Sequence, residues 1–172
     1  MRKETALRRG LPFSAYSAAW FGRNGPLVTL IDGLACATLV FVAVEDARRF
    51  RIRNSAILVL VGLFGLAAGL SGTGHDAFWH GVFATLVLVL MFGAFSLGLV
   101  GAGDAKLMAA ACLWTGPENA LLFAIALLCL TGLYGIGAKF GFFPARRDDH
   151  RVKIPFGPSI ALAWIMTIVL SR

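Results

Sequence analysis

Residues 83–100 read FATLVLVLMFGAFSLGLV, eighteen positions without a single charged side chain. A helix needs about 20 such residues to cross a bilayer core of about 30 Å. The rest of the chain has the same character, since 58% of its 172 residues are hydrophobic and only 15% are charged. A soluble domain carries about 25% charged residues. Lipid must therefore cover most of this surface, and the sequence predicts a polytopic membrane protein.

Apolar stretches on both sides of this segment predict an all-α domain of about six transmembrane helices. The expected spans cover residues 27–44, 56–70, 83–100, 105–114, 120–136 and 160–170. The fourth and sixth are shorter than a bilayer requires, so they need neighbours or preceding turn residues to complete them. We expect the membrane-embedded domain to occupy residues 27–172, after a basic tail formed by residues 1–26.

The net charge of +7 comes from clusters of Lys and Arg beside the apolar spans. Such clusters are typical of loops that face anionic lipid, so a bilayer is the expected partner and nucleic acid is not. Lys and Arg favour cytoplasmic loops, so the basic loops 46–54 and 139–153 are expected inside. The loops 71–80 and 115–119 contain no Lys or Arg and are expected outside. Both termini then lie outside. The five basic residues of the tail conflict with this, so either the tail re-enters at the interface or the true start lies downstream.

Two aspartates are the strongest candidates for chemistry. Asp46 ends the first span and Asp104 begins the fourth, and the inferred topology brings both to one level of the bilayer. Ionisable side chains at membrane depth are costly and are functional candidates by default. Two carboxylates in one low-dielectric site share a proton: the ionised one activates water, and the protonated one polarises a carbonyl. The alternative is that each caps a helix or lies in headgroup water, as expected for Asp32 and Asp76.

The surroundings of these aspartates carry further expectations. Gly101 and Gly103 should let the backbone turn and another chain approach closely before Asp104. Lys106 is expected to snorkel or to anchor the preceding loop, with a role in tuning Asp104 as the alternative. Glu45 should point away from Asp46, where it either attracts a basic peptide or is solvated.

No metal or other cofactor is expected. His75, His80 and His150 are predicted to lie in loops and have no ligand spacing. The three cysteines form no CxxC pair and are interpreted as packing residues.

Residues 101–107, GAGDAKL, resemble the GxGDxKL signature of the type IV prepilin peptidases, which are GxGD aspartic peptidases of membranes. Two more elements occur in the same order as in that family. Residues 46–54, DARRFRIRN, are similar to its first aspartate, basic residues and Asn54, and residues 153–158, KIPFGP, are similar to its third element with Pro155 and Gly157. Arg53 departs from the family pattern, which usually has proline there. The resemblance covers roughly residues 40–165.

This resemblance implies an aspartic endopeptidase with Asp46 and Asp104 as the catalytic pair. It implies a prepilin substrate whose short basic leader is removed at the cytoplasmic face of the bacterial inner membrane. The chain has no double CxxC, so it resembles the small type without methyltransferase activity that serves Flp (tight-adherence) pili. The tail matches no part of the pattern and is expected to be dispensable. The alternatives are a preflagellin-type peptidase, or a non-enzymatic transport or assembly component that uses the aspartates for protons.

Overall fold

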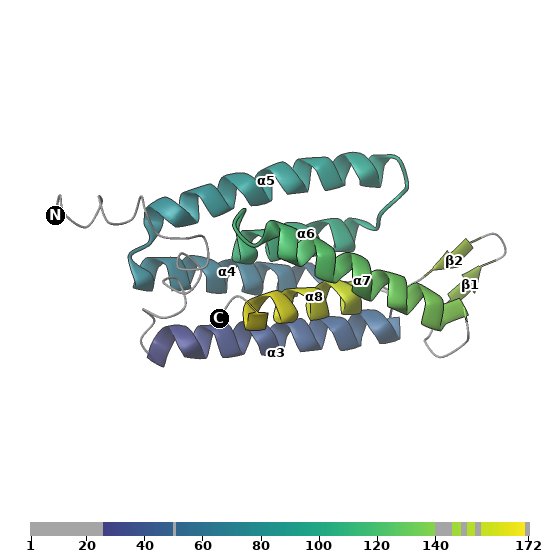
Figure 1. Ribbon diagram of the computed structural model, residues 1–172, viewed down its shortest axis with the longest axis horizontal. Coiled ribbons are helices and arrows are strands. Elements are labelled where there is room, and N and C mark those ends of the chain that lie inside the picture. The colour runs from purple at the N-terminus through teal and green to yellow at the C-terminus, as the bar shows by residue number, and fades with distance from the viewer. Residues whose placement is uncertain (1–25, 50, 140–145, 149–150, 154–155, 171–172) are drawn as a thin grey trace.

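The computed structural model describes residues 26–49, 51–139, 146–148, 151–153 and 156–170. This part of the chain forms an elongated bundle of six helices, one at each predicted span (Figure 1). The helices are α3 (Pro26–Arg49), α4 (Asn54–Ser71), α5 (Gly74–Ser96), α6 (Ala102–Thr115), α7 (Ala120–Lys139) and α8 (Gly157–Leu170). The predicted all-α membrane fold is confirmed. The predicted tail lies almost wholly outside the described residues.

The six helices fall into two classes by length. Four of them, α3, α4, α5 and α7, are long and apolar enough to cross a membrane. The other two, α6 and α8, have 14 residues each, which is about two thirds of the length a bilayer core requires. Both short helices pack against three or more neighbours, so surrounding helices complete them as expected. Helices satisfy their own backbone hydrogen bonds, which lipid cannot do.

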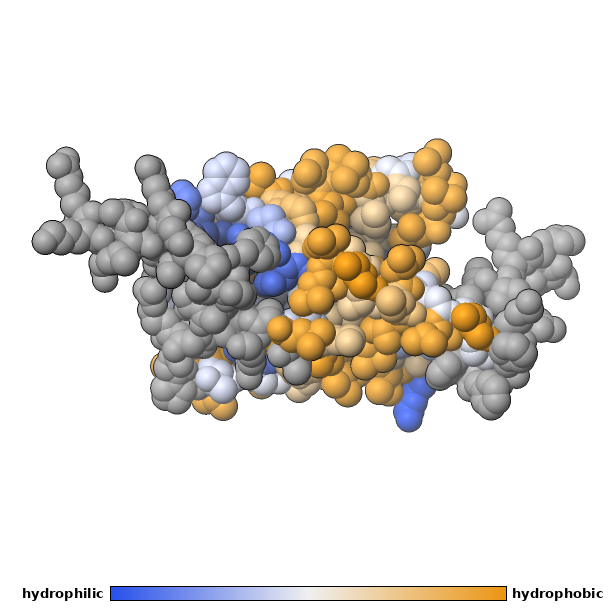
Figure 2. All heavy atoms as spheres, in the orientation of Figure 1, coloured by the Kyte–Doolittle hydropathy of each residue, from blue (hydrophilic) through white to orange (hydrophobic). Residues whose placement is uncertain are grey.

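The core and the lipid-facing surface differ in side-chain size. The buried face of α6 is built largely from alanines, and small residues let helix backbones approach closely in membranes. The largest fully buried side chains include Trp164, Leu39, Leu60 and Leu107. Many large apolar side chains are instead exposed, and Figure 2 shows a broad hydrophobic surface across the middle of the molecule. A soluble protein could not expose such a surface, so this band is the expected contact with lipid.

The structure corrects the boundaries of the third span. The predicted loop 71–80 is wrong for most of its length, because α5 already begins at Gly74 and continues to Ser96. Gly72, with a φ of 65°, ends α4 in the left-handed conformation that glycine adopts most easily. Only a short turn is then needed before α5. Hydropathy alone does not distinguish the first polar turns of a helix from a loop.

Two other predicted loops contain regular structure. Helix α3 continues beyond residue 44 to Arg49, so Asp46 lies in its last turns. Within the predicted charged loop 139–153, β1 (Arg146–Asp148) and β2 (Arg151–Lys153) form an antiparallel hairpin in which Arg147 pairs with Val152. His150 lies outside the described residues.

The bundle has two ends that differ in chemistry. At the end that carries the hairpin lie the C-termini of α3 and α7 and the N-termini of α4, α6 and α8 (Figure 1). We call this the aspartate end, because Asp46 and Asp104 lie there. At the other end lie the α4–α5 turn and the α6–α7 turn, and we call this the histidine end after His80. Both basic loops belong to the aspartate end, as the charge pattern predicted.

Candidate functional site

Asp46 lies in the last turns of α3, and only 4% of its surface is exposed. Its Oδ2 accepts a hydrogen bond of 2.9 Å from the backbone N–H of Gly157, the first residue of α8. The carboxylate therefore faces the N-terminus of a helix, which favours negative charge. A Cβ atom built on Gly157 would lie only 2.6–2.9 Å from Asp46 atoms. Glycine at this position makes the contact between α3 and α8 possible.

Asp104 lies in the first turn of α6. Its carboxylate accepts a hydrogen bond from the backbone N–H of Gly101, the residue that caps this helix. In a capping box, the side chain three positions after the cap residue likewise accepts a hydrogen bond from the backbone N–H of the cap residue. Gly101 has a φ of −72°, which any residue adopts, so the expected need for a special backbone conformation is wrong. Its glycine instead leaves room for the carboxylate, since a Cβ would lie 2.8 Å from Asp104 Oδ2.

The structure places the two aspartates, which are 58 positions apart in the chain, at the same end of the bundle. Asp104 is only partly buried, and the charge of Asp46 lies close enough to act on it. Tyr134 of α7 is also within electrostatic range of Asp46. In the described part of the chain, no Lys, Arg or His forms an ion pair with either aspartate. Two carboxylates without a matching cation favour sharing one proton.

The remaining acids of the helices lie elsewhere. Asp32 is buried in α3, but it lies 14 positions before Asp46, a separation of about 21 Å along the helix. Asp76 belongs to the histidine end, with its carboxylate 3.7 Å from His75 Nδ1. Neither acid can join the Asp46–Asp104 pair.

The loop formed by residues 51–53 connects α3 to α4 beside the aspartates. Arg53 Nε lies 2.7 Å from Glu45 Oε1, so Glu45 points away from Asp46 as predicted, toward an arginine instead of free solvent. A Cβ on Gly103 would lie 3.1 Å from Ile52 Cβ, so glycine at this position lets the 51–53 loop approach α6 closely.

Lys106 completes the contacts of this region. Its Nζ donates a 3.0 Å hydrogen bond to Asn54 Oδ1 across two exposed side chains. Lys106 therefore connects α6 to the start of α4. Of the other supporting residues, Gly157 contacts Asp46 directly and Pro155 lies outside the described residues.

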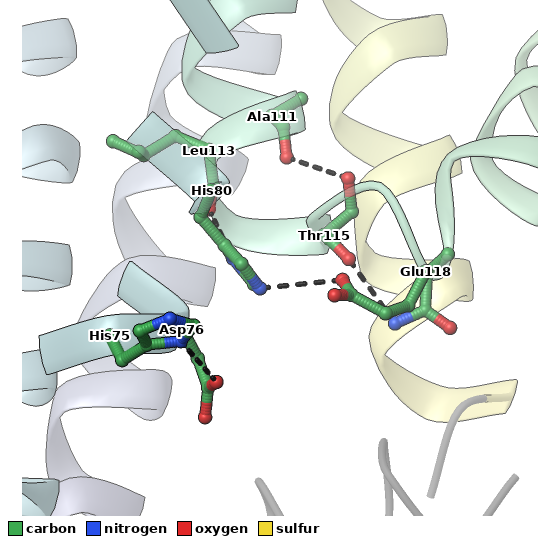
Figure 3. Close-up of polar contacts among 8 residues, drawn as sticks. His75, Asp76, His80, Ala111, Leu113, Thr115 and Glu118 are labelled. Carbon is green, nitrogen blue, oxygen red and sulfur yellow. Dashed lines mark hydrogen bonds and ion pairs between the residues drawn. The ribbon is translucent and has the colours of Figure 1, made fainter. Parts of the chain in front are cut away.

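The histidine end holds a cluster that the sequence did not predict (Figure 3). His80 was expected in a loop, but it is a buried residue of α5 whose ring stacks on Phe64. Its Nδ1 lies 2.9 Å from the carbonyl oxygen of Leu113, and its Nε2 lies 3.4 Å from Glu118 Oε2. Burial raises the pKa of Glu118, but the hydrogen bond and charge of His80 and a backbone hydrogen bond outweigh it, so this pKa lies below its ordinary value.

This cluster is explained by its position in the fold. His80 joins α5 to the end of α6 and to the α6–α7 turn, where Gly116 has a φ of 67°. A buried histidine whose ring nitrogens contact a carbonyl and a carboxylate, and which connects three elements, is typical of structural contacts. Among the described residues, no group of three or more His, Cys, Asp or Glu side chains is placed to hold a metal ion.

The helical bundle and its paired aspartates define a class of protein, the polytopic membrane proteins with ionisable groups buried at one end of the bundle. The comparison with protein families is more specific. Residues 33–136 match the type IV leader peptidase family, and the chain belongs to that family. The match includes both aspartates and stops before Gly157. No curated protein and no solved structure gives a significant match.

Membership in this family identifies the chain as a membrane-embedded peptidase. A peptidase acts on a protein substrate, so the family match favours the predicted peptidase over the alternative of a non-enzymatic transport or assembly component. Four long apolar helices support its place in a bilayer.

Proposed function

We propose that this chain is an aspartic endopeptidase that removes the short basic leader of Flp-type prepilins. Asp46 and Asp104 form its catalytic pair, and the reaction takes place at the cytoplasmic face of the bacterial inner membrane. The observation that carries the proposal is the meeting of two carboxylates at one end of the bundle without an ion-paired cation among the described residues. A like-charged pair is costly to maintain, and such arrangements concentrate at functional sites.

The geometry supports a shared-proton mechanism. With one proton on the pair, the ionised carboxylate removes a proton from water while the protonated carboxyl polarises the scissile carbonyl. The attack forms a tetrahedral intermediate, and the proton taken from water is passed to the leaving amine. Backbone N–H groups of Gly157 and Gly101 hold the two side chains in place through these steps. Catalytic side chains that are already held in position need little rearrangement when the reaction occurs.

The charge distribution supports the proposed face and substrate. The loop after Asp46 and the hairpin region hold most of the Lys and Arg found between the helices, and both lie at the aspartate end (Figure 1). Positive loops favour the cytoplasm, where a prepilin leader begins its path into the membrane. Since the chain has no CxxC pair, we propose cleavage without N-methylation of the product.

The test is cleavage of a candidate Flp-type prepilin by the full chain in membranes. Wild-type protein should shorten the prepilin by its leader, and mass spectrometry should find an unmethylated N-terminus. Asp46→Asn and Asp104→Asn should each abolish the size shift, because Asn is nearly isosteric but cannot exchange a proton. Asp76→Asn is the matched control at the histidine end and should cleave normally. Normal processing by Asp104→Asn would show that the chain is not an aspartic peptidase.

A further inference from the structure

The two helices that carry the aspartates do not pack against each other. Within the described residues, α3 and α6 share no backbone contact, whereas α4 and α8 each contact both of them. The relative position of Asp46 and Asp104 is therefore set by what lies between the two helices. One such connection is Gly157 at the start of α8, which binds Asp46. The other is the 51–53 loop with the start of α4.

The 51–53 loop is attached to both aspartate-bearing helices beside the aspartates themselves. On α3 it is held by Glu45, the residue before Asp46, through the 2.7 Å contact with Arg53. On α6 it is held where Ile52 packs against Gly103, the residue before Asp104. The Glu45 side chain is only 9% exposed, so this end of the ion pair is fixed by packing.

We propose that the 51–53 loop positions the catalytic pair, and that the Glu45–Arg53 ion pair fixes the conformation of this loop. This inference rests on the proposed function. Arg53 has a φ of −76° and a ψ of 133°, which are values that a proline adopts without strain. The ion pair thus stabilises, through electrostatic attraction, the backbone conformation at Arg53 that a proline ring would fix covalently. Glu45 and Arg53 are positioning residues, since they act through the aspartates.

Loss of the Glu45–Arg53 ion pair should affect the turnover number and the folding stability differently. The Arg53 side chain is 56% exposed, and ion pairs open to solvent contribute little to folding. The geometry of a reacting pair is far more sensitive, because a displacement of about 1 Å can cost about 10²-fold in rate. Loss of the ion pair should therefore lower the turnover number without unfolding the protein.

The experiment measures prepilin cleavage by the purified full chain in lipid vesicles. We expect Glu45→Gln and Arg53→Gln each to lower kcat about tenfold with KM unchanged, which is the pattern of a displaced catalytic group. The double variant should be no worse than either single variant. Arg53→Pro should restore most of the turnover that Arg53→Gln loses. In the Arg53→Pro background, Glu45→Gln should have no further effect.

Arg49→Gln removes the same charge from the exposed last turn of α3, outside the 51–53 loop, and serves as the matched control, with kcat expected within twofold of wild type. The thermal midpoint is measured for every variant, and a large decrease for Glu45→Gln would overturn the proposal in favour of a structural role. A raised KM that persists in the Arg53→Pro background would also overturn it, by showing that Glu45 binds the basic leader directly.

Failure of this proposal and failure of the proposed function give different results. If wild type cleaves, Asp104→Asn does not, and Glu45→Gln equals wild type, only the positioning role is wrong. If Asp104→Asn cleaves as fast as wild type, the proposed function itself fails.

Discussion

The two ends of the bundle place buried or partly buried acids in different electrostatic settings. At the histidine end, Glu118 lies 3.4 Å from His80, and the pair joins three elements of the fold. At the aspartate end, Asp46 and Asp104 approach each other, and within the described residues neither is ion-paired with a basic side chain. Glu118 thus has a histidine beside it, whereas a second carboxylate lies near Asp104, an arrangement that is common at functional sites. We therefore propose that the aspartate end is the reactive one.

If the ends face different sides of the membrane, labelling from outside should give an all-or-none difference. Single cysteines at Ser71 and Asn119, at the histidine end, should react with an impermeant reagent added to intact cells. Cysteines at Arg51 and Asp148, at the aspartate end, should react only after the cells are opened. Each variant is made in a background without the three native cysteines. The reverse pattern would place the aspartate end outside and contradict the cytoplasmic site.

A glycine substitution at the aspartate end should lower the cleavage rate, whereas one at the histidine end should lower stability. Gly157→Ala places a Cβ within 2.9 Å of Asp46, so cleavage should fall about 10²-fold through displacement of the carboxylate. Gly116→Ala places a Cβ against His80 and Glu118 at a φ of 67°, and should cost about 1–3 kcal/mol of stability. Cleavage rates per folded molecule and thermal midpoints are measured for both. Equal cleavage losses for the two variants would remove the distinction between the ends.

The His80–Glu118 pair should affect stability and leave the chemistry intact. Glu118→Gln is expected to lower the thermal midpoint by a few degrees while cleavage per folded molecule stays near wild type. The pKa of Glu118 lies below its ordinary value of 4.5, so the contribution of this carboxylate is complete above that pH and is lost as the pH falls through the folded-state pKa. The stability difference between wild type and Glu118→Gln should therefore vanish in acid. A difference that instead grows in acid would contradict the pair.

The smallest effect is expected from the basic tail. Removal of residues 1–26 should leave prepilin cleavage within about twofold of the full chain, because the match to the type IV leader peptidase family begins only at residue 33. The measurement compares equal amounts of membrane-inserted protein. Complete loss of cleavage in a truncated protein that inserts normally would assign the tail a role in the reaction.

Sequence patterns predicted the parts of this molecule that depend on hydropathy and on single motifs. The six spans, the short α6 and α8, and the location of Asp46 and Asp104 at the same end of the bundle followed from apolar length and from the position of each acid at a span end. Their role as a catalytic pair stays a prediction. The start of α5 was missed because His75, Asp76 and His80 look like loop residues, although a buried His80 has its partners in α6 and beyond.

Contacts between distant residues were the other part that the sequence did not predict. Glu45 and Arg53 were considered singly, and only the fold shows that the end of α3 turns the two side chains toward each other. Gly101 was expected to allow a turn, but its role depends on where the Asp104 carboxylate lies in space. These contacts depend on distances between residues in the folded protein, which the hydrophobic periodicity of the sequence does not predict.

The central claim is that Asp46 and Asp104 act as one unit, and a double-mutant cycle on prepilin cleavage tests it most directly. Asp46→Asn, Asp104→Asn and the double variant are assayed under single-turnover conditions in lipid vesicles. Loss of a general acid–base role costs about 10²–10⁴ in rate, and groups that act together give losses that do not multiply. We predict the same severe loss in all three variants. Losses that multiply in the double variant, or a single variant with near-normal cleavage, would contradict the shared-proton pair.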